Sequence, residues 1–495
     1  MRDEEKRTKV KPELPGGFRD YLPREMIARQ RMLDVIRRTY GLFGFDPIET
    51  PGMEYRRVLT GEDSDFRMTI YETRTSGSHD ITDDPDRTAL RFDHTVPLAR
   101  VVAANMGGAA EGAEKFRLPF KRYAAGNVWR GEKPQAGRFR EFMQFDADIV
   151  GSASPYADAE IIALMVETMR ALDIEHFVVR FNNRKLLNGL SAYAGFDLAL
   201  APEVLRVIDK LPKIGRAAVL RELAKPARDA QLAEGPLYGG DLEGAENEET
   251  ACGLGLAQDV VERIGAFLDL TGTTDELLDQ ASALFSGQAI AEDGIRELRA
   301  IVAALRAMAV DERCWAFDLS IARGLAYYTG PVFETFITNP DGTNIEGFGS
   351  VFSGGRFDDL VDRFGAGSIP ATGASIGVDR LFDYLVRLGK VVVQPTLAQV
   401  LVTVMDQAAM PEYLAMTGEL RAAGFRTILW IGSESAFKSQ MAYARGQEIP
   451  VVVIAGEREF ADGKVAVRDM DAREQREYPR GELVEVVRRI LAQGT

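Results

Sequence analysis

The strongest restriction on the fold is a pair of strand-like runs separated by a short loop that contains proline and glycine. The runs are KFRLPFKRYAAGNVWRG and RFREFMQFDADIVG, and the loop between them is EKPQAG. This pattern predicts a long antiparallel hairpin over residues 115–151. In the second run, a spacing of two residues places six side chains on one face of the strand: Arg138, Arg140, Phe142, Gln144, Asp146 and Asp148.

Polar and charged side chains beside an aromatic ring are unusual on the buried face of a strand. They suit the floor of a polar ligand pocket. The alternative is a solvent-exposed sheet face that carries surface ion pairs, and the pattern alone favours this alternative slightly.

The remaining pattern divides the chain of 495 residues into several parts, as expected for two to four domains with ample apolar material for a core. Residues 1–13 are a charged tail that we expect to be frayed. Apolar residues at helical spacing predict helices over 24–42 and 156–172, and FGFDPIETPGME predicts a short strand stopped by Pro51. FVVRFNN (177–183) predicts a further strand.

Residues 186–310 are Ala- and Leu-rich, acidic and predicted to be mainly helical, which indicates an inserted domain. Strand-like runs return over 315–338 and 347–360. ASIGVDRLFDYLVRLG predicts a strand that runs directly into a helix, and residues 391–398 form the clearest linker.

The last part of the chain has a different pattern. Short apolar strands at Val400–Met405, Thr427–Ile431 and Pro450–Ile454 alternate with helical stretches. Continuous apolar strands separated by helices predict a small α/β domain whose sheet is mainly parallel and buried on both faces.

Three further segments carry polar side chains next to predicted element ends. LRFDHTVPLAR places Asp93 and Thr95 between a strand and a helix, where they could also serve as an ordinary helix cap. ARGLAYYTG holds Arg323 with two tyrosines, and GVDRLFDYL places Arg380 at a strand-to-helix junction. No Walker motif, kinase signature, G-x-S-x-G or H-E-x-x-H is present, so a phosphate ligand would be bound by arginines.

Composition excludes several classes of protein. The net charge is −15, and almost all of the acidic excess falls in residues 151–397, so basic surface for a nucleic acid is confined to the two ends. Two cysteines, Cys252 and Cys314, and three histidines predict neither a disulfide framework nor a zinc site. We expect no signal peptide, no membrane span and a cytoplasmic location, because no long apolar segment is present.

These residues carry a family resemblance. VWRGEKPQAGRFREFMQFDADIVG resembles motif 2 of the class II aminoacyl-tRNA synthetases, in the form found in the histidyl-tRNA synthetase family, and ARGLAYYTGPVFE resembles that family's histidine-specific signature. SIGVDRL is similar to motif 3, and YGLFGFDPIETPGME to motif 1. The resemblance implies an α+β catalytic core with an antiparallel sheet over 14–185 and 311–390, a helical insertion over 186–310 and an anticodon-binding α/β domain over 399–495.

The resemblance also implies roles for individual residues around ATP. Arg130 would hold the α-phosphate and Glu132 the adenine amine, while the Phe142 ring would stack on adenine. Arg138 and Arg380 would lie around the γ-phosphate.

Histidine would be bound at both of its ends. Asp93, Thr95 and Gln144 would surround the α-amino group, and Asp148 and Tyr328, with Tyr327 beside them, would read the imidazole. Arg323 would act as the catalytic arginine between the substrate carboxylate and the α-phosphate, together with Arg130. No metal ligand is implied; Mg²⁺ would accompany ATP as the counterion of its phosphates.

Some positions depart from the family pattern. Ala326 replaces the usual Asp of the histidine signature, and Phe357 replaces a tyrosine. His94 stands where many members have Leu or Gly, and we interpret it as a bystander.

The main hypothesis is therefore a histidine–tRNA ligase that uses ATP, L-histidine and tRNA(His) and acts as a homodimer. One alternative is the histidine-sensing regulatory paralogue of ATP phosphoribosyltransferase. Such paralogues usually lack the anticodon domain and the ATP arginines. A class II synthetase for another amino acid is disfavoured by Asp148 and the paired tyrosines.

Overall fold

The computed structural model describes residues 10–60, 70–74, 87–106, 116–133, 139–226, 253–322, 328–432 and 436–493. The chain forms two compact units. One comprises Met1–Arg19 and Val35–Tyr384, and the other Asp20–Asp34 and Leu385–Thr495. No helix among the described residues combines the length and the apolar character that crossing a membrane requires.

The larger unit is built on a mixed sheet in which eight strands can be followed through the described residues. In sheet order they are β1 (Asp46–Pro47), β5 (Phe120–Trp129), β6 (Glu141–Val150), β11 (Ala371–Gly377), β10 (Phe352–Arg356), β9 (Pro331–Ile337), β7 (Phe177–Asn183) and β8 (Trp315–Phe317). Neighbours from β5 to β7 are antiparallel, whereas the β1–β5 and β7–β8 pairs at the two edges are parallel. The expected antiparallel core sheet is confirmed, with one parallel strand added at each edge.

The predicted hairpin forms the pair β5 and β6. Its register aligns Arg122 with Asp148 and Gly126 with Gln144. Along β6 the residues change from half-buried at Glu141–Gln144 to buried at Phe145–Val150, so the strand runs from the rim of the unit into its core. On the apolar face, the Phe145 ring meets Tyr40 edge-on at 5.0 Å between centroids.

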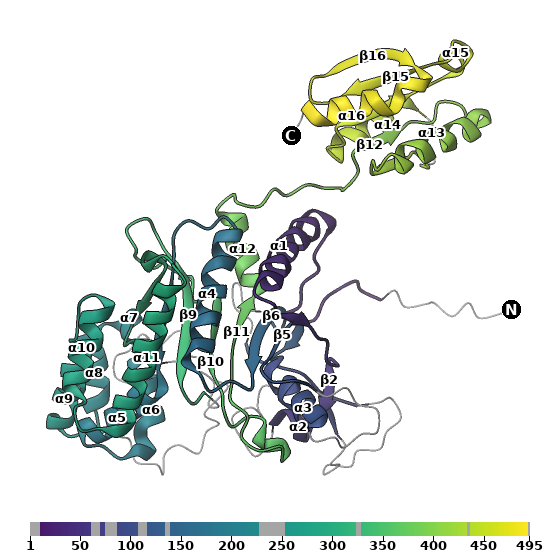
Figure 1. The fold of residues 1–495 in the computed structure, drawn as a ribbon. Helices are drawn as coiled ribbons and strands as arrows, with labels where there is room; N and C mark the ends of the chain where they lie inside the picture. The colour runs from purple at the N-terminus through teal and green to yellow at the C-terminus, as the bar shows by residue number, and fades with distance from the viewer. Residues whose placement is uncertain are drawn as a thin grey trace. The chain divides into compact units, whose positions relative to one another are not determined.

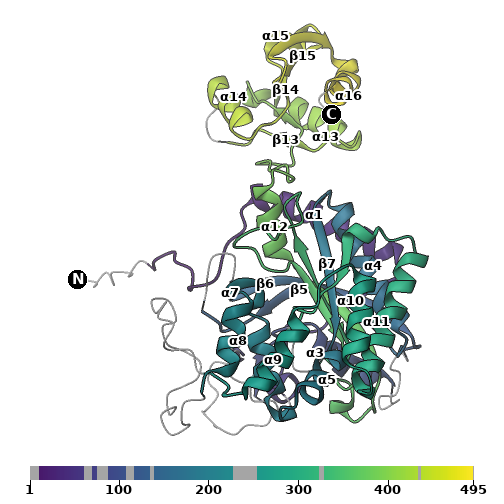
Figure 2. The ribbon, with the colours of Figure 1, turned by 90° about the vertical axis from the view of Figure 1, so that its left-hand side faces the viewer.

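Helices cover this sheet and extend away from it (Figures 1 and 2). α4 (Pro155–Ala171) is buried along most of its length and packs across β7 and β11; it begins at Ser154, whose side chain accepts a hydrogen bond from the Tyr156 amide. α11 (Ala289–Ala307) then packs on α4 and on α5 (Arg184–Ala194). The buried Arg356 guanidinium lies 2.6 Å from the Asp158 carboxylate and so joins β10 to α4.

The described part of residues 186–310 is helical, as predicted, and residues 227–252 lie outside the described residues. Besides α5 and α11 it contains η2 (Leu198–Leu200), α6 (Ala201–Ile208), α7 (Leu211–Ile214), α8 (Arg216–Ala224), α9 (Gln258–Leu268) and α10 (Thr274–Leu284). This region belongs to the same compact unit as the sheet. Its status as a separate inserted domain stays a prediction.

The N-terminal elements agree with expectation except near Pro51. α1 (Pro23–Leu42) is the predicted first helix. The strand expected before Pro51 is reduced to the two residues of β1, and a second strand, β2 (Met53–Tyr55), follows the proline. β2 pairs with β4 (Thr88–Leu90), which also pairs with β3 (Glu72–Thr73), in a small separate sheet flanked by α2 (Arg56–Thr60) and α3 (Thr95–Met106).

The smaller unit contains a sheet of order β13–β12–β14–β15–β16. The predicted apolar strands are β12 (Val400–Val402), β13 (Thr427–Leu429) and β14 (Val451–Ile454), and they are parallel. β15 (Lys464–Asp469) and β16 (Glu474–Pro479) add an antiparallel hairpin that the sequence pattern did not predict. The helices of this unit are α13 (Met410–Ala422), α14 (Phe437–Gly446), α15 (Glu457–Ala461) and α16 (Leu483–Gln493), and buried apolar clusters lie on both faces of the sheet.

Candidate active site

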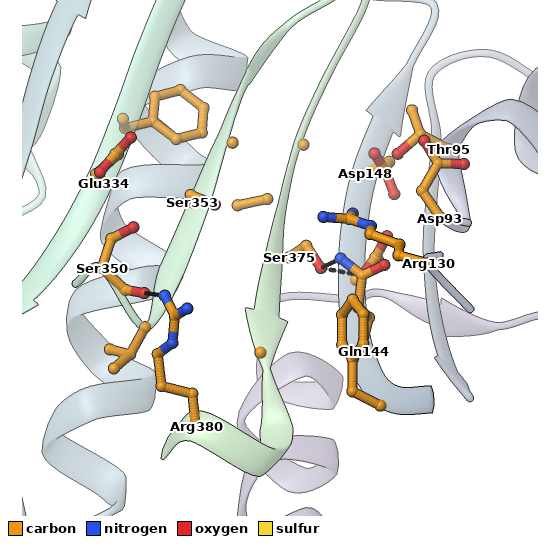
Figure 3. A pocket seen from close by; sticks show the side chains of 18 of the residues that line it. Asp93, Thr95, Arg130, Gln144, Asp148, Glu334, Ser350, Ser353, Ser375 and Arg380 are labelled. Atoms are coloured by element: carbon orange, nitrogen blue, oxygen red, sulfur yellow. Dashed lines mark hydrogen bonds between the residues drawn. The ribbon is translucent and has the colours of Figure 1, made fainter. Parts of the chain in front are cut away.

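A cavity of about 410 Å³ opens between the core sheet and the starts of α3 and α12 (Val378–Arg387) (Figure 3). Its floor and walls come from β6, β9, β10 and β11, and its polar lining includes Asp93, Thr95, Arg130, Glu132, Gln144, Asp146, Asp148, Glu334, Ser353, Ser375, Asp379 and Arg380. Phe142, Gln144, Asp146 and Asp148 all line it, so the prediction of a polar pocket floor is confirmed. The alternative of a solvent-exposed face is wrong, because Asp146 and Asp148 are each only 2% exposed.

Asp93 and Thr95 lie where β4 gives way to α3. The Asp93 Oδ1 atom accepts a hydrogen bond from the Val96 amide at 3.1 Å, which is the helix-capping role. Its Oδ2 atom is buried and has no hydrogen-bond partner within the described residues. The same carboxylate therefore caps α3 and offers an acceptor to the cavity.

Asp148 stands against a buried arginine that the sequence analysis did not single out. Arg122 is fully buried on β5; its Nη2 atom lies 2.7 Å from the Asp148 Oδ2 atom and also donates to the His94 carbonyl oxygen at 3.2 Å. Counting the hairpin register outward from the predicted loop would have placed Arg122 opposite Ala147, whereas the observed register is shifted by one residue and places it opposite Asp148. On its other side, Asp148 faces Gly373 of β11.

Burial sets the protonation of these carboxyl groups. Desolvation raises the pKa of Asp148 to about 7, although the Arg122 charge opposes the rise. Desolvation likewise raises the pKa of Asp93 and of Asp146 to about 6. A cavity with three such groups favours a ligand that brings positive charge or N–H donors, since either would restore the ionised forms.

Gln144 belongs to a side-chain network across β6 and β11. Its Nε2 atom donates to the Ser375 hydroxyl at 2.7 Å, and that hydroxyl in turn donates to the Asp146 carboxylate. The Gln144 Oε1 atom is buried and has no partner among the described residues. The sequence pattern put Asp146 on the same strand face as Gln144 and Asp148 but assigned it no role, and it did not identify Ser375.

Arg130 follows the end of β5 at the cavity wall. Its guanidinium lies 5.2 Å from the centroid of the Phe142 ring, and its Nε atom donates to the Phe92 carbonyl oxygen at 3.1 Å. Glu132 also lines the cavity. Its backbone carbonyl accepts a hydrogen bond from Arg140 at 3.1 Å, which ties the hairpin loop's two ends together.

The first turn of α12 forms the opposite end of the cavity, as Figure 3 shows for Arg380 and Ser350. The Arg380 Nη1 atom donates to the Ser350 carbonyl oxygen at 2.9 Å. The neighbouring Asp379 carboxylate accepts a hydrogen bond from the Met143 amide at 2.6 Å, just beyond the point where β11 stops pairing with β6. Asp379 was not predicted, because its contact joins residues 236 positions apart.

Three predicted site residues lie outside the described residues: Arg138, Arg323 and Tyr327. Ala326, the departure in the histidine signature, also lies there. Tyr328 is described and lines the cavity. Phe357, the other departure, is 2% exposed and packs in an apolar cluster with Leu360.

His94 does not line the cavity. It is buried, and its Nε2 atom donates to the Gly126 carbonyl oxygen at 3.2 Å. Burial and the nearby Arg91 lower the pKa of His94 to about 3, so the ring is neutral. Across the described ranges, no cluster of three or more His, Cys, Asp or Glu side chains could hold a metal ion.

Comparison with known proteins decides the family. The family model described as histidyl-tRNA synthetase matches residues 17–381. The chain belongs to the histidyl-tRNA synthetase family. An anticodon-binding domain model matches residues 399–490.

Individual relatives agree with this family assignment. The chain is 39% identical to a histidine–tRNA ligase of Jannaschia sp. over 95% of this chain and 92% of the relative, and 37% identical to one of Dinoroseobacter shibae over 100% of both. A histidyl-tRNA synthetase structure from Nostoc sp. superposes with a TM-score of 0.77 at 32% identity, covering 97% of this chain and 100% of that one. The predicted family, fold class and aminoacyl-tRNA ligase function are therefore confirmed.

Proposed function

We propose that this member of the family activates L-histidine with ATP to histidyl-adenylate and then transfers histidine to the 3′ end of tRNA(His). The assignment to this cavity rests on buried hydrogen-bond acceptors in its wall that no described residue satisfies. The Asp93 Oδ2 and Gln144 Oε1 atoms have no hydrogen-bond partner in the described part of the chain. Together with the Asp148 carboxylate, they would suit the donors at the two ends of histidine.

The family correspondence supports the individual roles. Asp93, Thr95 and Gln144 would bind the α-ammonium group, and Asp148 and Tyr328, with Tyr327, would bind the imidazole. A site that hydrogen-bonds a polar side chain leaves groups unpaired when an apolar competitor enters, and it can discriminate by about 10⁴-fold without editing.

The chemistry requires positioning rather than a base. The ionised carboxylate of histidine attacks the α-phosphorus of ATP, a new C–O–P linkage forms, and diphosphate leaves. The catalytic contribution is alignment and positive charge on the phosphate oxygens. Arg130 and Arg323 would provide that charge, with Arg138 and Arg380 at the γ-phosphate and Glu132 and Phe142 at adenine.

Mg²⁺ is proposed as the counterion of the ATP phosphates. A magnesium ion bound mainly by phosphate oxygens needs one or two protein carboxylates and no closed cage. Glu334 of β9 lines the cavity and could supply such an oxygen. The ion would neutralise phosphate charge, while the arginines align the reacting groups.

A homodimer, tRNA binding and a cytoplasmic location complete the proposal. Exposed apolar side chains in the motif 1 region support self-association: Leu42 is 86% exposed, Met53 48% and Tyr55 44%. Sedimentation should give twice the mass of one chain. Because phosphate contacts release counterions, the KM for tRNA should rise with salt concentration; a KM independent of salt would contradict this picture of the RNA surface.

The first test is histidine-dependent exchange of pyrophosphate into ATP, with and without Arg323→Ala. We expect exchange with histidine alone among the amino acids and its loss in the variant. A folded protein that binds histidine without exchange would instead indicate the sensing paralogue. The anticodon-binding match over residues 399–490 favours the ligase over that paralogue.

A further inference from the structure

The network of Gln144, Ser375 and Asp146 determines which end of an amide faces the ligand. The three side chains lie on the adjacent strands β6 and β11, where Asp146 and Ser375 are direct cross-strand partners. Figure 3 shows the Gln144 amide and Ser375 in contact at the cavity wall. The oxygen and nitrogen of a glutamine amide have almost the same shape, so its orientation is decided by hydrogen-bond polarity.

That polarity is fixed from the Asp146 end. An ionised carboxylate can only accept, so the single Ser375 proton is committed to Asp146. The Ser375 oxygen must then act as an acceptor, and the Gln144 group that meets it at 2.7 Å must be the NH₂. The carbonyl oxygen of Gln144 is consequently turned the other way, where it is buried and has no partner in the described residues.

We propose that Ser375 and Asp146 are positioning residues for histidine, which hold the Gln144 amide with its oxygen toward the ligand's α-ammonium group. This proposal rests on the proposed function. A reversed amide would present an N–H to the ammonium group, replacing an attraction with a repulsion. Neither positioning residue needs to touch the substrate for the orientation to matter.

Two variants test the polarity. Ser375→Ala removes the hydroxyl that connects Asp146 to Gln144. Asp146→Asn reverses the direction of the hydrogen bonds, because an asparagine NH₂ can donate to Ser375 and the serine proton can then go to the Gln144 oxygen. Each variant should raise the Kd for L-histidine on the order of 10- to 100-fold, as expected for loss of a hydrogen bond to a charged group. The measurement is isothermal titration calorimetry of the full chain at pH 8.

The decisive readout compares L-histidine with 3-(imidazol-4-yl)propanoate, which is the same molecule without its amino group. The Kd for this analogue should change less than about threefold in both variants, because the analogue has no ammonium group for Gln144 to recognise. Equal weakening of both ligands would show a general loss of site structure and overturn the proposal. Unchanged histidine binding would overturn it as well.

Two controls distinguish the loss of the Ser375 hydroxyl from a general effect of substitution on the fold. Ser375→Thr retains the hydroxyl and should bind histidine as the wild type does; if it is as weak as Ser375→Ala, the proposal is wrong. Thr343→Ala removes a hydroxyl that donates to Asp341 at 2.6 Å in an exposed turn, and it should leave both ligands unaffected. If the wild type shows no histidine-dependent exchange, the proposed function is wrong. If the wild type shows exchange but both variants bind histidine as the wild type does, only this inference is wrong.

Discussion

Replacing Arg122 by methionine should destabilise the larger unit in a manner that depends on pH. The arginine is fully buried and its Nη2 atom lies 2.7 Å from Asp148, so methionine would fill much of the same space while leaving that carboxylate without its cation. Breaking a buried ion pair by removing one partner costs about 3–5 kcal/mol. We expect a loss of this size at pH 8, where Asp148 is ionised.

The loss should shrink in acid. The pKa of Asp148 is raised to about 7 in the folded protein, against about 3.9 in an unfolded chain, so the folded state binds the extra proton between these values. Wild-type stability therefore falls as the pH rises through this window. Without Arg122 the folded pKa rises further, so the difference between variant and wild type grows toward pH 8. At pH 5.5 Asp148 is already neutral, so the substitution removes no charge pair with Asp148 but only the hydrogen bonds that Arg122 donates to Asp148 and to the His94 carbonyl oxygen, about 1 kcal/mol each.

Differential scanning calorimetry of both proteins at pH 5.5 and pH 8 measures the effect. The transition of the larger unit is the one that histidine shifts upward. Arg216→Met serves as the matched control, because its partner Asp269 is exposed and such a pair contributes at most about 1 kcal/mol. An equal loss at both pH values, or a loss at pH 8 no larger than that of the control, would refute the reasoning.

The remaining predictions concern three separate positions. Gly373→Ala would place a Cβ 2.0 Å from the Asp148 Oδ1 atom, and the forced displacement should raise the KM for histidine on the order of 100-fold in pyrophosphate exchange. His94→Gln should make the stability less sensitive to acid. The pKa of His94 is lowered to about 3 in the folded protein, so below pH 6.5 the unfolded state binds a proton that the folded state does not. When the pH falls from 7 to 4.5, the free energy of unfolding measured in urea should therefore decrease by about 2–3 kcal/mol less in the variant than in the wild type. Phe142→Ala should raise the KM for ATP on the order of tenfold through lost stacking, with a smaller change for histidine; equal changes would contradict the proposed adenine contact.

Local patterns in the sequence predicted much of the fold and one face of the site. The hairpin, the polar face of β6, the helical region after β7 and the three parallel strands of the smaller unit all follow from periodicity over a few residues. β15 and β16 were missed because most residues of β16 are exposed and lack an apolar run. The strand expected before Pro51 is shorter than predicted, and β2 after the proline was missed because three residues are too few to leave a clear pattern.

Contacts between distant segments could not be predicted in the same way. Ser375 meets residues 229 and 231 positions away, and Asp379 meets the Met143 amide 236 positions away. These contacts depend on the pairing of β6 with β11, which no local pattern specifies. The contact of Arg122 with Asp148 was not predicted either, because the loop expected at residues 132–137 gives a register one residue away from the observed one.

The glycines of β10 and β11 limit how this cavity could be redesigned for another amino acid. Both Gly354 and Gly373 line the cavity; a Cβ on Gly354 would lie 2.0 Å from the Gly373 carbonyl oxygen, and one on Gly373 would lie 2.7 Å from the Ala147 carbonyl oxygen. Backbone atoms thus form this side of the cavity, and no larger residue can grow there without moving a strand. A directed-evolution library for altered substrate choice should therefore vary the β6 and α3 side chains and leave the glycines unchanged.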